Sequence, residues 1–468
     1  MIVSEAFKGK TYAVLGLARS GLATVDTLVA SGARVVAWDS REEARALVAG
    51  KADLGDPMEI DLAGFDGIVV SPGVPLNRHP IAMRAKIAGV PIIGDIELFA
   101  LARRTLPPHK VVGITGTNGK STTTALIHHI IEQAGFPTVM GGNIGLPILS
   151  QPPLEPNLHG VGVYVLELSS YQIDLTHSLD CDVAVLLNIT PDHLDRYDGF
   201  AGYVASKARL FTMQSAGHVA VIATEDEPSR GIATQLRHSR EGGNPSPDLA
   251  SVRESGEMDA RLRGDDVVEV GSGDIDPVAQ LTWPALQGPH NAQNAAVSVA
   301  VAQALGIDEA TIAAALASYA SLPHRMQAVG THNGVLYVND SKATNAASTA
   351  PALAAWPAKD GKPRIHWILG GVAKSDNLDE CVPHFANIAH AYTIGEAGHM
   401  FADLLRASMA VDDSEMLSAA VRRAARIAQP GDVVLLSPAC ASFDQFRDFE
   451  ARGDAFAAAV AALDSIGE

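Results

Sequence analysis

The sequence predicts an α/β protein of three domains, each with a mainly parallel sheet covered by helices. Short, fully apolar runs alternate with helical stretches along the whole chain, as is typical of strands that are buried on both faces. A chain of 468 residues is long enough for about three domains. Two breaks, at residues 102–110 and 321–325, separate three successive series of strands and helices. The predicted domains are residues 1–104, 105–322 and 323–468.

The first series predicts a Rossmann-like domain. After a strand at residues 11–17, Gly16 and Gly21 flank a turn that opens a helix, with Ala18 where the dinucleotide fingerprint has its second glycine. Asp39 ends the next strand, where an acidic residue can accept a hydrogen bond from a ribose or a base. The segment 71–73 (Ser-Pro-Gly) follows a third strand, at the sheet edge where ligands bind. A Rossmann turn without a ligand explains the same pattern.

The second series contains the strongest motif, GITGTNGKST at residues 113–122, between a predicted strand and a helix that begins at Lys120. The backbone N–H groups of such a turn and the helix N-terminus attract phosphate. Lys120 is placed to reach the β- and γ-phosphates, and the Ser121 hydroxyl to bind Mg²⁺. Ile114 stands where a strict P-loop has glycine, so the motif predicts a variant P-loop-type ATPase domain. A glycine-rich turn without nucleotide is the alternative.

Three further polar residues of the second series are candidates. Glu167 ends an apolar run, and a buried carboxylate is costly unless it is paired or metal-bound, so it is either a Mg²⁺ ligand or a strand-edge carboxylate. His193 lies beyond a strand end, as a metal ligand, a proton carrier or a loop hydrogen-bonding residue. Spacing alone predicts that Lys207 faces solvent. The polar segment 237–264 predicts a surface insertion without a function.

The third series predicts a Rossmann-like domain with polar residues after three of its strands. These residues are Asp340, Lys342 and Thr344 after the first strand, Lys374 after the second and Ser442 after the third. Lysines and hydroxyls at one edge of a sheet suit a carboxylate or phosphate ligand, whereas helix capping explains single residues only. Cys440 is interpreted as a buried small residue, because no acid–base partner accompanies it.

Composition and charge exclude several classes of protein. The formal net charge of −18 disfavours binding to nucleic acid or to an anionic membrane surface. No apolar run is long enough to span a membrane. Three widely spaced cysteines and an N-terminus without a signal-peptide pattern predict a cytoplasmic protein.

Eight segments together resemble the Mur ligase family. They are TGTNGKST, GGNIG (141–145), LELSSYQ, NITPDHLDRY, PHNAQNA (289–295), LPHRM, NDSKATN and SPACASFDQFRDFEARG. The first alone is shared with folylpolyglutamate synthetases, whereas NDSKATN, SPACASFDQF and the Rossmann-like first domain are closest to the branch that adds D-glutamate. The resemblance implies ATP-dependent amide formation in peptidoglycan precursor synthesis. The carboxylate of UDP-N-acetylmuramoyl-L-alanine becomes an acyl phosphate, which D-glutamate attacks through a tetrahedral intermediate. It also implies a monomer.

The resemblance assigns the site residues as follows. It implies catalytic roles for Lys120, Glu167, His193 and Lys207, with ATP, two Mg²⁺ ions and a CO₂-derived carbamate on Lys207. Ser121 and Glu167 would hold one Mg²⁺ ion, and His193 and carbamylated Lys207 the other. ATP would contact Gly116, Thr117, Asn118, Gly119, Lys120, Ser121, Thr122, Asn291, Asn294, Arg325 and Asp340. The uridine substrate would contact Leu17, Ala18, Asp39, Ser40, Arg41, Ser71, Gly73, Asn143, Ser169 and Gln172. D-Glutamate would contact Lys342, Thr344, Lys374, Ser442 and Phe449.

Three alternative functions stay open on the sequence. The first is another ligase of the superfamily, such as an L-glutamate-using relative or a folate polyglutamylase, although the folate enzyme lacks a Rossmann-like first domain. The second is a nicotinamide-dependent dehydrogenase built on residues 16–21, which Ala18 and the P-loop of the next domain disfavour. The third is a binding protein that retains the fold without the chemistry.

Overall fold

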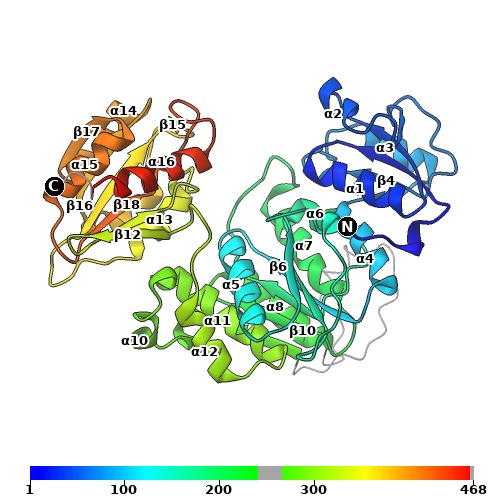
Figure 1. Cartoon of the computed structure of the whole chain (residues 1–468), viewed down its shortest axis with the longest axis horizontal. Helices are drawn as coiled ribbons and strands as arrows, with labels where there is room; N and C mark the ends of the chain where they lie inside the picture. The colour runs from blue at the N-terminus through cyan, green and yellow to red at the C-terminus, as the bar shows by residue number, and fades with distance from the viewer. Residues whose placement is uncertain (241–265, 464–468) are drawn as a thin grey trace. The chain divides into compact units, whose positions relative to one another are not determined.

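The computed structural model describes residues 1–240 and 266–463, which form two compact units (Figure 1). One unit comprises residues 1–271 and 296–315, and the other comprises residues 272–295 and 316–468. The first unit contains an N-terminal and a central sheet, and the second contains a third sheet. Within the described ranges, no helix has the length and apolar character needed to cross a membrane.

The N-terminal sheet has five parallel strands in the order β3-β2-β1-β4-β5. Its strands are β1 (Thr11–Leu15), β2 (Arg34–Trp38), β3 (Asp53–Leu54), β4 (Gly67–Val70) and β5 (Ile92–Ile93). Its helices are α1 (Arg19–Ala30), α2 (Glu42–Ala46), α3 (Ile81–Ala88) and α4 (Asp95–Ala102). The strand order reverses at β1 and β4, so the loops after these strands open the crevice where doubly wound sheets bind ligands.

The central sheet has six parallel strands in the order β11-β10-β9-β6-β8-β7. Its strands are β6 (His109–Thr115), β7 (Thr138–Gly142), β8 (Gly162–Glu167), β9 (Val183–Leu186), β10 (Val219–Ala223) and β11 (Val267–Val270). Its helices are α5 (Lys120–Gln133), α6 (Ser170–Asp174), α7 (Gly199–Thr212) and α8 (Glu227–Arg240). Every residue of β8 and β9 is buried, as their apolar runs predict.

The third sheet has six strands in the order β12-β13-β18-β14-β16-β17, and only β12 is antiparallel to its neighbour. Its strands are β12 (Gln327–His332), β13 (Val335–Asn339), β14 (Ile365–Gly370), β16 (Ile388–Ile394), β17 (Val411–Glu415) and β18 (Val433–Leu436). A two-stranded sheet pairs β15 (Val372–Ala373) with β19 (Cys440–Ala441). Its longer helices are α13 (Ala346–Ala354), α14 (Gly398–Leu405), α15 (Leu417–Ile427) and α16 (Phe449–Ala461).

The boundary between the two compact units crosses two helices. The segment before the third sheet folds as α10 (Pro277–Gln280), α11 (Pro289–Ala304) and α12 (Glu309–Ser318). The division falls between residues 295 and 296 inside α11 and between residues 315 and 316 inside α12. Both helices are rich in alanine.

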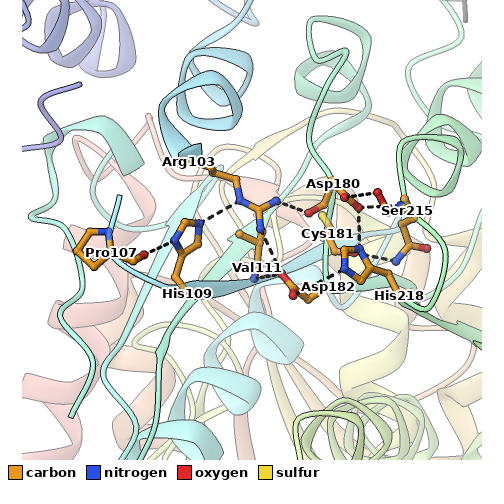
Figure 2. Close-up of polar contacts among 10 residues, drawn as sticks. Arg103, Pro107, His109, Val111, Asp180, Cys181, Asp182, Ser215 and His218 are labelled. Atoms are coloured by element: carbon orange, nitrogen blue, oxygen red, sulfur yellow. Dashed lines mark hydrogen bonds and ion pairs between the residues drawn. The ribbon is translucent and has the colours of Figure 1, made fainter. Parts of the chain in front are cut away.

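A polar network fixes the connection from the N-terminal sheet to the central sheet (Figure 2). Arg103, directly after α4, donates from Nε to Nε2 of His109 at 3.0 Å and from Nη2 to Oδ2 of Asp182 at 3.2 Å. The same Asp182 oxygen accepts from the backbone N–H of Val111 at 2.8 Å. Because these residues stand at the amino ends of β6 and β9, the network occupies the edge opposite the strand ends that carry the predicted site.

The structure corrects two details of the sequence prediction. The insertion predicted at residues 237–264 does not begin as a loop, because residues 237–240 continue α8 and Arg237 forms an ion pair with Glu269 of β11 at 2.7 Å. The remainder of that segment lies outside the described residues. The edge strands β3, β7, β11, β12 and β17 and the two-stranded sheet are not predicted by the sequence.

Candidate functional site

The glycine-rich turn at residues 116–122 joins β6 to α5, as predicted. Gly119 caps the helix at φ 82°, in the left-handed region that favours glycine. A Cβ on Gly116, at φ 155°, would lie 2.9 Å from the Cβ of Leu187, so the close approach of this turn to the end of β9 also requires glycine. Asn188 accepts from the N–H groups of Thr117 and Asn118, both at 2.8 Å. The turn is thus held with its backbone at the carboxyl edge of the sheet.

Lys120 begins α5 and folds back over this turn. Its Nζ donates to the carbonyl oxygens of Gly116 at 2.9 Å and of Thr117 at 2.8 Å. A lysine ammonium beside a helix N-terminus gives a positively charged site for a phosphate. The structure therefore places the predicted phosphate-binding residues together, with residues 116–119 in the turn and residues 120–122 at the start of α5.

Three side chains from neighbouring strand ends meet beside the turn. Oγ of Ser121 donates to Oε2 of Glu167 at 2.6 Å, and Nδ2 of Asn143 donates to Oε1 of the same carboxylate at 3.0 Å. Glu167 is only 3% exposed. Asn143 reaches it because Gly142 adopts φ 84°, and a Cβ there would lie 2.2 Å from the carbonyl oxygen of Glu167. The candidate Mg²⁺ ligands Ser121 and Glu167 are thus in contact.

Lys207 is buried, so the expectation from spacing alone that it faces solvent is wrong. It lies on α7 with an exposed fraction of 1%, and its Nζ donates to the carbonyl oxygen of Gly116 at 2.8 Å. Nζ also lies 4.6 Å from the ring centre of Tyr203. Burial, and then the nearby positive charge of Lys120, lower the pKa of Lys207 well below its usual value of 10.5. A neutral amine at this position avoids the cost of an unpaired buried charge.

His193 lies on an exposed loop after β9, at a positive φ of 53°. Its Nε2 is 3.5 Å from Oδ2 of Asp192, and its ring centre is 5.0 Å from that of Tyr171. Tyr203 lies near both residues, with its ring centre 6.3 Å from that of His193 and 4.6 Å from Nζ of Lys207. The two candidate ligands of a second metal thus lie near the same aromatic ring.

Ser169 and Gln172, predicted for the uridine substrate, form the capping box of α6. The backbone N–H of Gln172 donates to Oγ of Ser169 at 3.3 Å, and Oε1 of Gln172 accepts from the N–H of Ser169 at 3.1 Å. These contacts satisfy N-terminal donors of a five-residue helix that begins three residues after Glu167. They therefore hold the two side chains against each other at the start of α6.

The N-terminal candidates gather at the carboxyl ends of β1, β2 and β4. Asp39 accepts from the N–H of Leu17 at 2.7 Å and from the N–H of Arg41 at 3.0 Å. Burial raises the pKa of Asp39, but hydrogen bonds from Arg41 and Leu17 outweigh it and lower the pKa to about 2. Oγ of Ser71 donates to the carbonyl of Gly16 at 3.0 Å, so the loops after β1 and β4 are joined. Ala18, Ser40 and Gly73 lie on the same loops.

In the C-terminal unit four of the predicted D-glutamate residues lie on loops that follow β13, β15 and β19, and the fifth, Phe449, begins α16. Nζ of Lys374 donates to Oγ1 of Thr344 at 3.2 Å, and Nζ of Lys342 lies 3.9 Å from the ring centre of Phe449. Ser442 directly follows β19, whose pairing with β15 brings the loops after β14 and β18 together. Two ammonium groups beside hydroxyls at one sheet edge can bind carboxylates.

Arg452 is the residue of this region that the sequence analysis did not single out. It is 1% exposed and donates to Oγ and the carbonyl of Ser341, at 3.0 and 2.8 Å, and to the carbonyl of Cys440 at 3.0 Å. Burial lowers the pKa of Arg452 to about 10. Helical periodicity indicates that Arg452 is buried, because it lies three residues after Phe449 and four before Phe456, on the buried face of α16. The same segment buries Cys440, whose pKa burial raises to about 12, as expected of an unreactive thiol.

The remaining nucleotide candidates belong to the same unit as the third sheet. Nδ2 of Asn294 donates to Oδ1 of Asn291 at 3.1 Å, at the start of α11. Asp340 accepts from Oγ of Ser437 at 2.8 Å and from the N–H of Met326 at 3.1 Å, and burial raises its pKa to about 7. Arg325, in the adjoining loop, acts on Asp340 through its positive charge. The predicted ATP residues are thus divided between the two units.

Comparison with known proteins identifies the family. Three families match in chain order: the Mur ligase MurD-like N-terminal domain at residues 10–94, the Mur ligase middle domain at 114–302 and the Mur ligase glutamate ligase domain at 324–440. A protein of Novosphingobium aromaticivorans named UDP-N-acetylmuramoylalanine–D-glutamate ligase is 61% identical over 99% of this chain and 97% of its own. The chain belongs to the Mur ligase family. Proteins of the same name from Sphingopyxis alaskensis (61%) and Zymomonas mobilis (55%) match over 99% of this Mur ligase and 100% of their own lengths.

Solved structures of other Mur ligases share the fold. MurF from Acinetobacter baumannii superposes with a TM-score of 0.54 at 16% identity, covering 93% of this Mur ligase and 90% of that chain. MurC from Thermotoga maritima gives a TM-score of 0.52 at 15% identity, covering 98% and 99%. These matches confirm the predicted α/β architecture.

Proposed function

We propose that this Mur ligase joins D-glutamate to UDP-N-acetylmuramoyl-L-alanine at the expense of ATP, in peptidoglycan precursor synthesis. The observation that carries the proposal is full-length identity of 55% to 61% with ligases of that name. The alternative of a dehydrogenase leaves residues 116–122, Glu167 and Lys207 without a role. Retention of all these polar side chains in contact also disfavours a binding protein without chemistry.

The reaction requires a carboxylate to become an electrophile. Transfer of the γ-phosphoryl group to the carboxylate of the L-alanyl substrate makes its oxygen a leaving group, and the amine of D-glutamate then attacks the acyl phosphate. Negative charge grows on the transferred group and on the tetrahedral intermediate, so preorganised positive groups lower the barrier. We assign this role to Lys120 and to the N-terminus of α5. The turn 116–119 would hold the phosphates through its backbone N–H groups.

The contact between Ser121 and Glu167 fits a magnesium ion. Mg²⁺ takes oxygen ligands and is usually held by one or two carboxylates together with substrate phosphates. Ser121 and Glu167 supply a hydroxyl and a carboxylate 2.6 Å apart at the phosphate-binding turn. When bound, the ion would neutralise charge on the phosphates.

We also propose that Lys207 carries a carbamate. Only a neutral amine attacks CO₂, and burial lowers the pKa of Lys207 well below its usual value. The product is an anion, which the neighbouring Lys120 would stabilise and which would turn Lys207 into an oxygen ligand. Together with His193, which lies near the same Tyr203 ring, it would hold a second Mg²⁺ ion.

We assign the remaining candidate residues to parts of the three substrates. The loops that carry Leu17, Ser40 and Ser71 would bind the uridine diphosphate, with Asn143, Ser169 and Gln172 along the muramoyl path. Lys342, Thr344, Lys374, Ser442 and Phe449 would bind D-glutamate, and Asn291, Asn294, Arg325 and Asp340 would bind the nucleoside of ATP.

Two organisational proposals accompany this function. The domain boundaries 1–104, 105–322 and 323–468 are supported by the three sheets, each of which has all its strands inside one range. A cytoplasmic location is supported by three buried cysteines without disulfides.

The deciding experiment measures phosphate release from MgATP in the presence of UDP-N-acetylmuramoyl-L-alanine and one amino acid. D-Glutamate, L-glutamate, L-alanine and meso-diaminopimelate are compared, and Lys120→Met serves as the inactive control. We expect release with D-glutamate only. Release with another amino acid would replace the proposed specificity but keep the ligase chemistry. No release with any of them, from protein that binds ATP, would overturn the proposal.

A further inference from the structure

Arg196 joins two loops that carry candidate site residues. The first, residues 71–78, follows β4 and carries the uridine candidates Ser71 and Gly73. The second, residues 188–198, follows β9 and carries His193. Nη2 of Arg196 donates to the carbonyl oxygens of Pro72 at 3.3 Å and of Val74 at 3.0 Å, and its Nη1 lies 3.4 Å from that of Gly73. The guanidinium thus caps three successive carbonyls of the first loop.

The first loop returns two hydrogen bonds to the second. Nδ2 of Asn77 and Nη2 of Arg78 both donate to the carbonyl oxygen of Asp195, at 3.0 and 3.2 Å. Bonds therefore run in both directions between the same two segments. Such reciprocal bonds fix the register of one loop on the other.

Arg196 is also held against the residues that surround His193. Its guanidinium carbon lies 4.2 Å from the ring centre of Tyr171, and the ring of Tyr171 in turn contacts that of His193 at 5.0 Å. The backbone N–H of Arg196 donates to the carbonyl oxygen of His193 at 2.9 Å. A displacement of Arg196 would thus alter the contacts of both loops, residues 71–78 and residues 188–198.

Side-chain packing does not replace these polar bonds. A cavity of about 370 Å³ lies beside the two loops and is lined by Val74 and Leu76 of the first loop, Tyr197 of the second and Gly202 of α7. A core that is closely packed would position the loops without help, but an unfilled interface leaves their separation to the hydrogen bonds. We therefore expect these hydrogen bonds to affect the relative position of the two loops more than the stability of the fold.

We propose that Arg196 is a positioning residue that fixes the uridine-binding loop relative to His193. The inference rests on the proposed function, because it assumes that Ser71 and Gly73 bind the uridine substrate. An arginine suits the task because its planar fork can donate to several carbonyls at once, whereas a lysine ammonium is a point charge on a flexible stem. Lysine is therefore expected to restore the function only in part.

The test compares steady-state kinetics of Arg196→Ala and Arg196→Lys with the unmodified enzyme. We expect Arg196→Ala to raise KM for UDP-N-acetylmuramoyl-L-alanine by about tenfold or more, with KM for ATP and D-glutamate changed less than about twofold. Arg196→Lys should lie between the two. The matched control is Arg209→Ala, because Arg209 lines the same cavity but donates to Thr176 at 2.9 Å without reaching the first loop. Asn77→Ala tests the reciprocal bond independently and should raise the same KM.

The outcomes separate this inference from the proposed function. An inactive unmodified enzyme would contradict the function, whereas an active enzyme with unchanged KM values in Arg196→Ala and Asn77→Ala would overturn the inference alone. A fall in kcat without a change in KM for the uridine substrate would also overturn it, because it would place Arg196 at the reacting centre. If Arg196→Ala fails to fold, the KM of Asn77→Ala decides.

Discussion

The guanidinium of Arg452 holds Ser341 by both its side chain and its backbone, with Nε donating to Oγ at 3.0 Å and Nη2 to the carbonyl oxygen at 2.8 Å. It also donates to the carbonyls of Cys440 and Ala441, at 3.0 and 3.3 Å. A buried cation therefore joins the loops that follow β13 and β18, which carry the candidate D-glutamate residues. It also adds positive charge behind a proposed carboxylate site.

Replacing this arginine should damage both stability and substrate use. Arg452→Met fills similar space but leaves several buried carbonyls without a donor, so we expect a loss of about 2–4 kcal/mol in the free energy of unfolding. KM for D-glutamate should rise more than KM for ATP, because the loops of Thr344 and Ser442 lose their common anchor. Denaturant unfolding and steady-state kinetics measure the two effects.

The control for Arg452 is another arginine of the same segment. Arg447 is exposed and pairs with Asp448 at 3.1 Å, and such surface pairs contribute little. Arg447→Met should therefore leave stability and both KM values close to those of the unmodified enzyme. Equal effects of the two substitutions would contradict the anchoring role of Arg452.

The carboxylate of Glu167 should control the response to magnesium. Glu167→Gln keeps an oxygen acceptor for Ser121 but removes the negative charge, so the fold should persist while kcat falls by about a hundredfold or more. The Mg²⁺ concentration that gives half-maximal phosphate release should rise. The matched control is Glu155→Gln, because Glu155 is exposed and lies in the segment before β8. An unchanged Mg²⁺ dependence in Glu167→Gln would exclude Glu167 as a ligand.

Much of the fold follows from the sequence because the central strands are uniformly apolar. β9 and β18 lie between other strands and read as continuous hydrophobic runs, and β6, also an inner strand, is buried from Val111 to Thr115. The edge strands β17 and β7 have the sequences VDDSE and TVMGG, and neither is a continuous apolar run of the kind that predicts a buried strand. Their conformation depends on pairing with a neighbour, which local sequence does not contain.

Local sequence patterns indicate candidate site residues that lie together in one segment. They do not indicate residues whose position depends on tertiary contacts. Residues 116–122 and Glu167 were found because strand-to-helix turns have a recognisable pattern. Lys207 was expected to face solvent, although it lies four residues after Tyr203 and three before Leu210, on the buried face of α7. Helical periodicity would have found it. Arg196, by contrast, meets its partners through a contact between distant segments that no local pattern reveals.

Lys207→Ala should abolish most activity and regain part of it with a short carboxylate. Formate or acetate can enter the space left by the side chain and supply the oxygen ligand that the carbamate would provide. Lys86→Ala, on the exposed face of α3, should behave as the unmodified enzyme. With carbon-13-labelled bicarbonate, the unmodified enzyme should show a carbamate resonance that the Lys207 variant lacks. Full activity in the variant without added carboxylate would exclude the carbamate.

The network at the amino ends of the central strands should make stability depend on pH (Figure 2). Nδ1 of His218 lies 2.7 Å from Oδ1 of Asp180, and this hydrogen bond raises the pKa of His218 above 6.5. The charges of Asp182 and Arg103 act on the same ring in opposite directions. Burial raises the pKa of Asp180, but hydrogen bonds from His218 and Ser215 outweigh it and lower the pKa below 3.8.

The sign of the pH effect follows from these two shifts. Because the folded state raises the pKa of His218, its contribution is fully present below pH 6.5 and is lost as the pH rises through the folded-state value. The contribution of Asp180 is present above pH 3.8 and is lost as the pH falls through its folded-state value. The pair therefore stabilises the fold most between these limits, by about 1 kcal/mol for a partly exposed pair.

His218→Gln should remove this dependence while leaving the rest of the network in place. Denaturant unfolding of the unmodified protein and of His218→Gln should differ most near pH 5.5, and the difference should shrink as the pH rises above 6.5 through the folded-state pKa. His238→Gln, on the exposed face of α8, changes a histidine whose Nδ1 lies 2.8 Å from the carbonyl oxygen of Thr234, and it should follow the unmodified protein at every pH. A difference that grows with rising pH would mean that His218 is neutral in the fold and that Asp180 gains nothing from its charge.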